Sequence, residues 1–116
     1  MVCYNGIDSN SIKWKLINKF MITFKDLKFE PRDFGGVGAT HTFDNGITIS
    51  VQASKLNYST PREDLTSSDQ FSSFEVAIWN EDGDFVTKDL FQADDDVVGW
   101  CERDDIDDII AMVANQ

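Results

Sequence analysis

Residues 74–91, FEVAIWNEDGDFVTKDLF, decide the fold, because two apolar stretches in this segment flank a turn sequence. Apolar side chains occupy every second position of 74–78, which is the period of a half-buried strand. Glu81-Asp82-Gly83 predicts a three-residue loop, since glycine adopts positive φ without steric cost. The segment is therefore predicted to be a β-hairpin whose second strand covers 85–90.

The register of this hairpin follows from its loop. It places Trp79 opposite Phe85 near the turn, and it creates one apolar face on which Lys88 is the exception. It also places Glu75 opposite Asp89, and like charges across a ladder disfavour pairing. We therefore expect the hairpin to fray or bulge at that pair.

A second hairpin is predicted over 39–53, with Asp44-Asn45-Gly46 as its loop. A three-residue loop puts the apolar residues of both strands on one face, whereas a two-residue loop would place Asp44 opposite an isoleucine. The predicted cross-strand pairs are Phe43 with Ile47, His41 with Ile49, and Ala39 with Val51.

Isoleucines spaced three and four residues apart predict an amphipathic helix over about 103–114, with two aspartates at the positive end of its dipole. Residues 94–100 are predicted to form a short helical turn. Residues 21–29 fit either an edge strand or a helix. The strand is preferred because Glu30 precedes a proline, and such a residue avoids the helical region.

Two further segments are predicted to be connectors. Gly35-Gly36-Val37-Gly38 precedes a predicted strand and is not followed by Lys-Ser or Lys-Thr, so a flexible connector is favoured over a phosphate-binding loop. Residues 54–73 contain eight Ser or Thr and one proline, which is typical of a long surface loop. We expect Leu65 and Phe71 to pin this loop to the body.

Together these elements predict one α+β domain over 21–116: an antiparallel sheet of two β-hairpins, with four or five strands and a C-terminal amphipathic helix packed on one face. Residues 1–20 form a basic N-terminal extension whose apolar spacing allows a helix. This extension is either an ordinary helix packed on the domain or an optional addition, because Met21 could be a second translation start.

The net charge of the 116-residue chain is −11, and it is uneven. Residues 1–32 carry six basic and three acidic side chains, whereas 80–108 carry two basic and twelve acidic ones. Such a body repels nucleic-acid phosphates, so direct binding of nucleic acid is not expected. A partner protein with a basic surface is the natural complement.

The two cysteines, Cys3 and Cys101, make no disulfide framework and fit a reducing compartment, or at most one bridge. No long apolar run predicts a signal peptide or a membrane span. A cytoplasmic location is therefore expected.

No catalytic or metal motif stands out. His41 is the only histidine, and its place on the apolar face of 39–53 favours a core or rim residue over a general base or metal ligand. Cys101 lacks a visible third group for a Cys–His nucleophile. A calcium loop that started at Asn80 would have its glycine at the fourth position instead of the sixth. We therefore predict no enzyme activity, no metal and no cofactor.

Trp79 and Trp100 have two interpretations. Buried, they belong to the core; exposed beside acidic residues, they are interface anchors. The core is favoured for Trp100, and both interpretations stay open for Trp79.

The predicted binding surface is acidic. Its main charges lie before and within the terminal helix: Asp94, Asp95, Asp96, Asp104, Asp105, Asp107 and Asp108. A second patch lies in the central turn: Glu81, Asp82 and Asp84. We expect these carboxylates to occupy a basic site on another macromolecule, in the strongest form as a nucleic-acid mimic, because duplex DNA carries about one charge per 1.7 Å of its axis. Charge that only keeps the domain soluble is the alternative; one contiguous acidic face would favour mimicry, and scattered charge would favour solubility.

A second hypothesis is a small enzyme or small-molecule-binding module with its site under 54–73. Such a site would be a deep, partly apolar pocket that holds His41 or a carboxylate with a shifted pKa.

Four stretches resemble small acidic bacteriophage proteins of unassigned function: MITFKDLKFEP at 21–31, FDNG at 43–46, SFEVAIW at 73–79 and DDVVGW at 95–100. The resemblance covers about residues 21–114 and leaves 1–20 unmatched. It implies a phage accessory protein that inhibits a host defence nuclease, or an enzyme of transcription or replication, in the bacterial cytoplasm. It defines no site residue.

Overall fold

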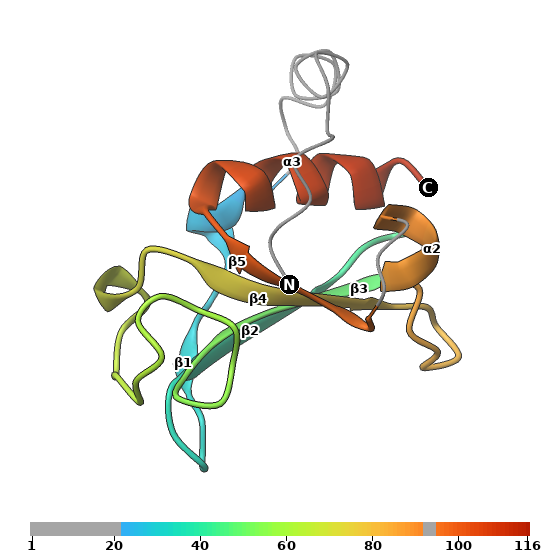
Figure 1. Cartoon of the computed structure of the whole chain (residues 1–116). Coiled ribbons are helices and arrows are strands. Elements are labelled where there is room, and N and C mark those ends of the chain that lie inside the picture. Colours follow the sequence, from blue (N-terminus) through green and yellow to red (C-terminus); the bar gives the residue numbers. More distant parts are fainter. Residues whose placement is uncertain (1–21, 92–94) are drawn as a thin grey trace.

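The computed structural model describes residues 22–91 and 95–116. Five strands form one open antiparallel sheet in which each strand pairs with the next along the chain (Figure 1). The strands are β1 (Glu30–Pro31), β2 (Val37–Thr42), β3 (Thr48–Ala53), β4 (Phe74–Trp79) and β5 (Val97–Cys101). The helices are α2 (Thr87–Phe91) and α3 (Arg103–Ala114), with 3-10 helices η1 (Phe24–Asp26) and η2 (Ser68–Gln70). The predicted α+β fold is therefore confirmed. The predicted extension at 1–20 lies outside the described residues, as do Met21 and Asp94.

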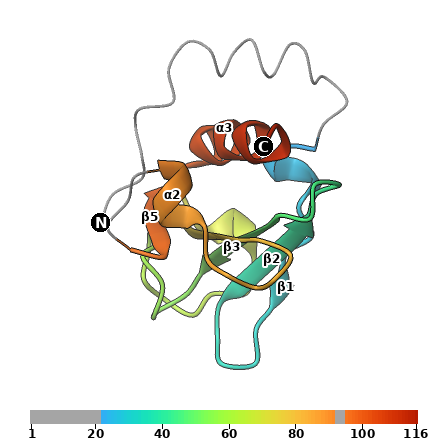
Figure 2. The same ribbon diagram turned by 90° about the vertical axis from the view of Figure 1, so that its right-hand side faces the viewer.

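The C-terminal helix packs on one face of the sheet, as predicted (Figures 1 and 2). α3 covers the predicted residues, and four of its apolar side chains have no exposed surface: Ile106, Ile109, Ile110 and Val113. They share one core with alternate side chains of the central strands: Ile49, Val51, Phe74, Val76 and Ile78. Each such burial stabilises the fold by roughly 1.5–3 kcal/mol. None of the described helices is long and apolar enough to span a membrane.

The hairpin of β2 and β3 has the predicted register. His41 pairs with Ile49, Ala39 pairs with Val51, and the Phe43 N–H donates to the Ile47 carbonyl at 2.8 Å. The side chain of Asn45 fixes the loop, because its Oδ1 accepts from the Ile47 N–H at 3.0 Å. Its Nδ2 donates to the Val113 carbonyl at 2.9 Å, which ties this turn to the end of α3.

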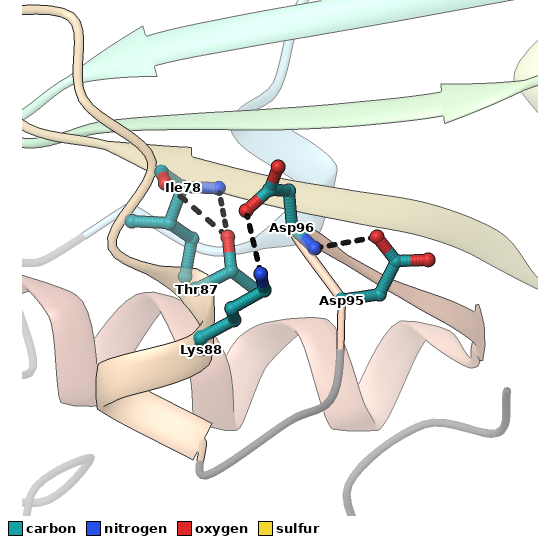
Figure 3. Close-up of polar contacts among 5 residues, drawn as sticks. All are labelled: Ile78, Thr87, Lys88, Asp95 and Asp96. Carbon is teal, nitrogen blue, oxygen red and sulfur yellow. Dashed lines mark hydrogen bonds and ion pairs between the residues drawn. The ribbon is translucent and has the colours of Figure 1, made fainter.

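The central hairpin forms only in part. Trp79 bridges Phe85, as predicted, but the predicted second strand over 85–90 is wrong, because the chain turns into α2 at Thr87. The buried Thr87 hydroxyl accepts from the Ile78 N–H at 2.9 Å and donates to the Ile78 carbonyl at 3.2 Å (Figure 3). The Thr87 side chain thus forms the hydrogen bonds with Ile78 that a neighbouring strand would have formed. Because residues 87–91 are helical, Glu75 does not pair with Asp89.

The outer edge of β4 is paired with β5 instead. Ala77 pairs with Val97 and Phe74 pairs with Cys101, so the predicted helical turn over 94–100 is wrong for 97–100. Two adjacent β-branched valines favour the extended backbone there. Because α2 leaves the edge of β4 after Thr87, that edge is open for β5.

A bulge in β5 turns Trp100 away from the core. Three steps of β5 span the two steps of β4 between Phe74 and Val76, and Trp100 has a φ of +54°. Its half-buried ring lies 5.0 Å from the ring of Tyr58. The prediction that Trp100 belongs to the core is therefore wrong.

The segment before the sheet is not the predicted strand over 21–29. Hydrogen bonds to carboxylates favour η1: the Thr23 N–H donates to Asp26 Oδ2 at 2.9 Å, and the Phe24 N–H donates to Asp107 Oδ1 of α3 at 2.7 Å. Such side-chain bonds compete with a strand ladder. The edge strand is confined to the two residues of β1.

The predicted glycine connector is a tight turn between β1 and β2. The Arg32 N–H donates to the Gly36 carbonyl at 3.0 Å, and Gly35 and Gly36 have φ of +106° and +75°. Gly36 lies against the Ala53 carbonyl, where a side chain would have no room. Val37 and Gly38 already belong to β2.

The long loop 54–73 is pinned to the body by Phe71, which is buried, and by Leu65, which packs against the core, as predicted. Arg103 adds a second anchor. Its guanidinium donates to the Phe71 carbonyl at 2.9 Å and to the Ser68 carbonyl at 3.0 Å. The loop is therefore attached to the first residue of α3.

Replacing Thr87 by valine keeps the shape of the side chain and removes its hydroxyl. Because the buried Ile78 N–H would lose its acceptor, we expect the free energy of unfolding in urea to fall by about 1–3 kcal/mol. Thr40→Val, at an exposed strand position, is the matched control and should change stability by less than about 0.5 kcal/mol. Equal stabilities of the two variants would contradict this role of Thr87.

Arg103→Lys keeps the positive charge but loses the planar fork that reaches two carbonyls. We expect a loss of about 1–2 kcal/mol and faster amide hydrogen exchange within 66–73, because that part of the loop would open locally. Arg62→Lys, at an exposed position of the same loop, is the control. Unchanged exchange within 66–73 in the Arg103 variant would show that the fork does not hold the loop.

Candidate functional site

The antiparallel register gathers separate turns at one end of the sheet. Thr48, the first residue of β3, pairs with Trp79, the last residue of β4. Val97, the first residue of β5, pairs with Ala77 nearby on β4. The β2–β3 turn, the segment after β4 and the start of β5 therefore lie together. We call the carboxylates of these segments and of α2 the acidic end: Asp44, Glu81, Asp82, Asp84, Asp89, Asp95 and Asp96.

The turn after β4 holds its backbone and leaves its carboxylates outside. Asn80 Oδ1 accepts from the N–H groups of Asp82 and Asp84, both at 3.0 Å, and Gly83 has a φ of +86°. The side chains at 81, 82 and 84 are exposed. The turn is thus a fixed platform for three negative charges.

The two turns touch each other. A Cβ added at Gly46 would lie 2.9 Å from Glu81 Oε2, so the Glu81 side chain packs over the β2–β3 turn. Lys88 is the one basic residue in the segments of the acidic end, and its Nζ lies 3.9 Å from Asp96 Oδ1 (Figure 3). Both of these side chains are about half exposed, so this pair contributes little stability and offsets only one charge.

The predicted carboxylates of α3 lie elsewhere. α3 begins at the opposite end of the sheet, and Asp105 there accepts from the Glu102 N–H at 2.9 Å. Asp107 holds the Phe24 N–H, Asp108 is half-buried, and Asp104 is exposed. Asp105 and Asp107 thus hold backbone N–H groups. The structure brings together the predicted Glu81, Asp82, Asp84, Asp95 and Asp96, but not the α3 set.

The opposite end of the sheet carries mixed charge. Its loops and the start of α3 contain both basic and acidic residues: Arg32, Lys55, Arg62 and Arg103 with Asp33, Glu63, Asp64, Asp69, Glu102, Asp104 and Asp105. The concentration of negative charge is therefore a property of one end, not of the whole surface.

An aromatic pair borders the acidic end. Phe85 is 51% exposed, and its ring meets the ring of Trp79 edge to face, with centroids 6.1 Å apart. Trp79 is half-buried. The hairpin register predicted the pairing of these rings. The exposure of Phe85 was not predicted, because a strand over 85–90 was expected where the chain turns into α2.

His41 lies at the rim of the core, as predicted. It is half-buried on β2, and its ring meets that of Phe43 edge to face at 4.8 Å. Cys101 is buried on β5, and its thiol donates weakly towards the carbonyls of Val98 and Gly99 at 3.7 and 3.8 Å. β3 and β4 lie between β2 and β5, so the backbones of β2 and β5 are three strand spacings, about 14 Å, apart. His41 and Cys101 do not form a Cys–His pair. Cys3 lies outside the described residues.

A groove of about 530 Å³ lies on the face of the sheet opposite α3. Residues within and on both sides of β1 form its rim, and residues of β2 and β3 form its floor. It contains no residue of 54–73 and does not contain His41, so it differs from the pocket expected under that loop. Among the described residues, no three His, Cys, Asp or Glu side chains lie close enough together to hold a metal ion.

No protein-family model, curated protein or solved structure gave a significant match to this chain.

Proposed function

We propose that this chain is a non-enzymatic binding protein whose acidic end occupies a basic surface of another macromolecule. One observation carries the proposal: seven carboxylates from separate segments gather at one end of the sheet, with Lys88 as the one basic residue among them. Complementary charge steers association and selects the partner. Charge that served solubility alone would not need to gather at one end.

In the strongest form of the proposal, the partner is a nucleic-acid-binding enzyme and the acidic end imitates a phosphate backbone. Duplex DNA carries about one charge per 1.7 Å of axis. Each of its strands carries about one charge per 3.4 Å. Three carboxylates within the four residues 81–84 match the density of one strand, because these residues span at most about 11 Å. An enzyme that used its cationic site to bind the acidic end would be blocked from binding nucleic acid.

The aromatic pair supports a protein as the partner. Aromatic side chains are enriched at the centres of protein interfaces, where partly buried rings fill pockets and surrounding groups exclude water. Phe85, which follows Asp84 in the sequence, is exposed, and its ring contacts the half-buried ring of Trp79. A partner that fits this surface has an apolar pocket with basic residues around it.

The resemblance to bacteriophage proteins suggests which enzymes to test. A phage accessory protein in the bacterial cytoplasm would meet defence nucleases, including CRISPR nucleases, and the enzymes of transcription and replication. We therefore propose inhibition of one of these as the biological role.

The test is capture of a partner from bacterial lysate on the tagged full chain, with washes at low and then high salt. We expect a nucleic-acid-binding enzyme to be retained at low salt and released at high salt, because exposed charge pairs are screened. Adding the chain to that enzyme should abolish its DNA binding. An enzyme that keeps its DNA binding would contradict mimicry.

Neutralising the turn with E81Q/D82N/D84N should weaken binding of the captured enzyme about tenfold or more, since three exposed charges at an interface are worth on the order of 1–3 kcal/mol together. The matched control is D33N/E63Q/D69N, which removes the same charge from exposed positions at the other end of the sheet. Equal weakening by the two variants would mean that only net charge matters, and would contradict a specific acidic end. Thermal unfolding of both variants checks that the fold is intact.

A further inference from the structure

The groove on the open face of the sheet has a positively charged rim, although the chain is strongly acidic. Lys28 and Arg32 line it together with one carboxylate, Glu30, at its β1 edge. Within the described residues, neither cation forms an ion pair with an acidic side chain. These two cations beside one carboxylate give the rim a net positive charge on a chain whose net charge is −11.

Arg32 is held in position. Its Cδ and Nη1 lie 3.1 and 3.2 Å from the place where a Cβ of Gly38 would stand, so the absence of a side chain at Gly38 lets Arg32 lie along the sheet. On its other side, the Arg32 Cζ lies 4.3 Å from the centroid of the Phe34 ring. The guanidinium is thus preorganised at the groove, and its planar fork suits a phosphate or carboxylate.

The floor of the groove offers neutral hydrogen-bonding groups. Thr40 on β2 and Ser50 and Gln52 on β3 line it. Gln52 Nε2 donates to Ser50 Oγ at 2.7 Å, which fixes the amide against the sheet. Hydroxyl and amide groups in this arrangement suit a ligand that carries hydroxyl groups of its own.

An aromatic ring closes the other end. Trp79 lines the groove and pairs across the sheet with Thr48, four residues along β3 from Gln52. Four residues of a strand span about 13 Å, so the backbone position of Trp79 lies about that far along the sheet from the level of Gln52. The half-buried indole offers a surface on which a flat ring can stack.

We propose that this groove binds a small anion that carries a flat ring, of the mononucleotide class. Its anionic group lies at Arg32 and Lys28, its hydroxyls face Thr40 and Gln52, and its ring stacks on Trp79. The groove volume of about 530 Å³ lies within the range typical of small-molecule sites.

The surroundings select against longer nucleic acids. A strand that extended beyond Trp79 would run towards the acidic end, where Glu81 and Asp84 repel phosphates. A neutral sugar, by contrast, would offer no negative charge to Lys28 and Arg32. The charge distribution therefore favours one short anion. This site shares Trp79 with the aromatic pair beside the acidic end, whereas its cationic rim belongs to the groove alone.

The test is a titration of the full chain with adenosine 5′-monophosphate, followed by nuclear magnetic resonance of backbone amides and by calorimetry. We expect chemical-shift changes at Arg32, Gly38, Gln52 and the Trp79 indole, and an affinity at least about tenfold higher than that for adenosine, because only the phosphate reaches the cationic rim. Inorganic phosphate should bind more weakly than the nucleotide, because it cannot stack.

Arg32→Gln should weaken binding of the nucleotide about tenfold, and Lys28→Gln should weaken it in the same direction. Lys55→Gln removes one exposed positive charge outside the groove and should have less than about a twofold effect. E81Q/D82N/D84N should retain nucleotide binding, which separates this test from that of the acidic end. Any of three results would overturn the proposal: no shifts in the groove, equal affinities for the nucleotide and adenosine, or tighter binding of a single-stranded oligothymidylate than of the nucleotide.

Discussion

The structure depends on the packing of one helix against one face of a five-stranded sheet. α3 contributes Ile106, Ile109, Ile110 and Val113, all with no exposed surface, to a core shared with β3 and β4. A sheet has two faces, and the described chain supplies a helical cover for only one (Figure 1). The other face is consequently polar where the strands alternate outward, as at Thr40, Ser50 and Gln52.

The same arrangement needs protected edges, because an exposed strand edge can pair with another chain. β1 is two residues long and includes Pro31, which has no N–H to donate. At the other edge, β5 contains the bulge at Trp100, which breaks the regular ladder. Both devices leave the open face available for a ligand while they limit pairing between sheets.

Sequential antiparallel pairing also explains where the charge lies. In a sheet whose strands follow chain order, every second connection lies at the same end. Carboxylates that are far apart in the sequence therefore lie close together in space. The connections at the other end carry mixed charge, and Arg103 uses its guanidinium there to hold the 54–73 loop. Charge near α3 is largely used for structure, whereas charge at the acidic end remains accessible.

The sequence predicted those elements whose local signals agree. The Asp44-Asn45-Gly46 loop specified the register of β2 and β3, and the isoleucine spacing specified α3. The strand over 85–90 was wrong because apolar alternation does not reveal that the Thr87 hydroxyl can replace a neighbouring strand. The misfit of Lys88 and the expected repulsion at Asp89 were signals against that strand.

Much of the candidate surface could not be predicted, for a different reason. Arg32 and Trp79 are far apart in sequence and line one groove only because β1 to β4 bring them onto one face. The exposed carboxylates of 81–84 were correctly placed in a turn, but the structural use of Asp105 and Asp107 depends on backbone groups at Glu102 and Phe24. Composition gives the amount of charge, while topology decides which charges are accessible.

The most direct test of the claim that topology concentrates accessible negative charge at one end is a titration of the full chain with a short oligolysine peptide at low salt, followed by backbone amide chemical shifts. The account predicts the largest changes within 43–47, 80–85 and 95–96, because these segments belong to the acidic end and contain no basic residue. Largest changes within 104–108, or changes of equal size around the whole molecule, would contradict it.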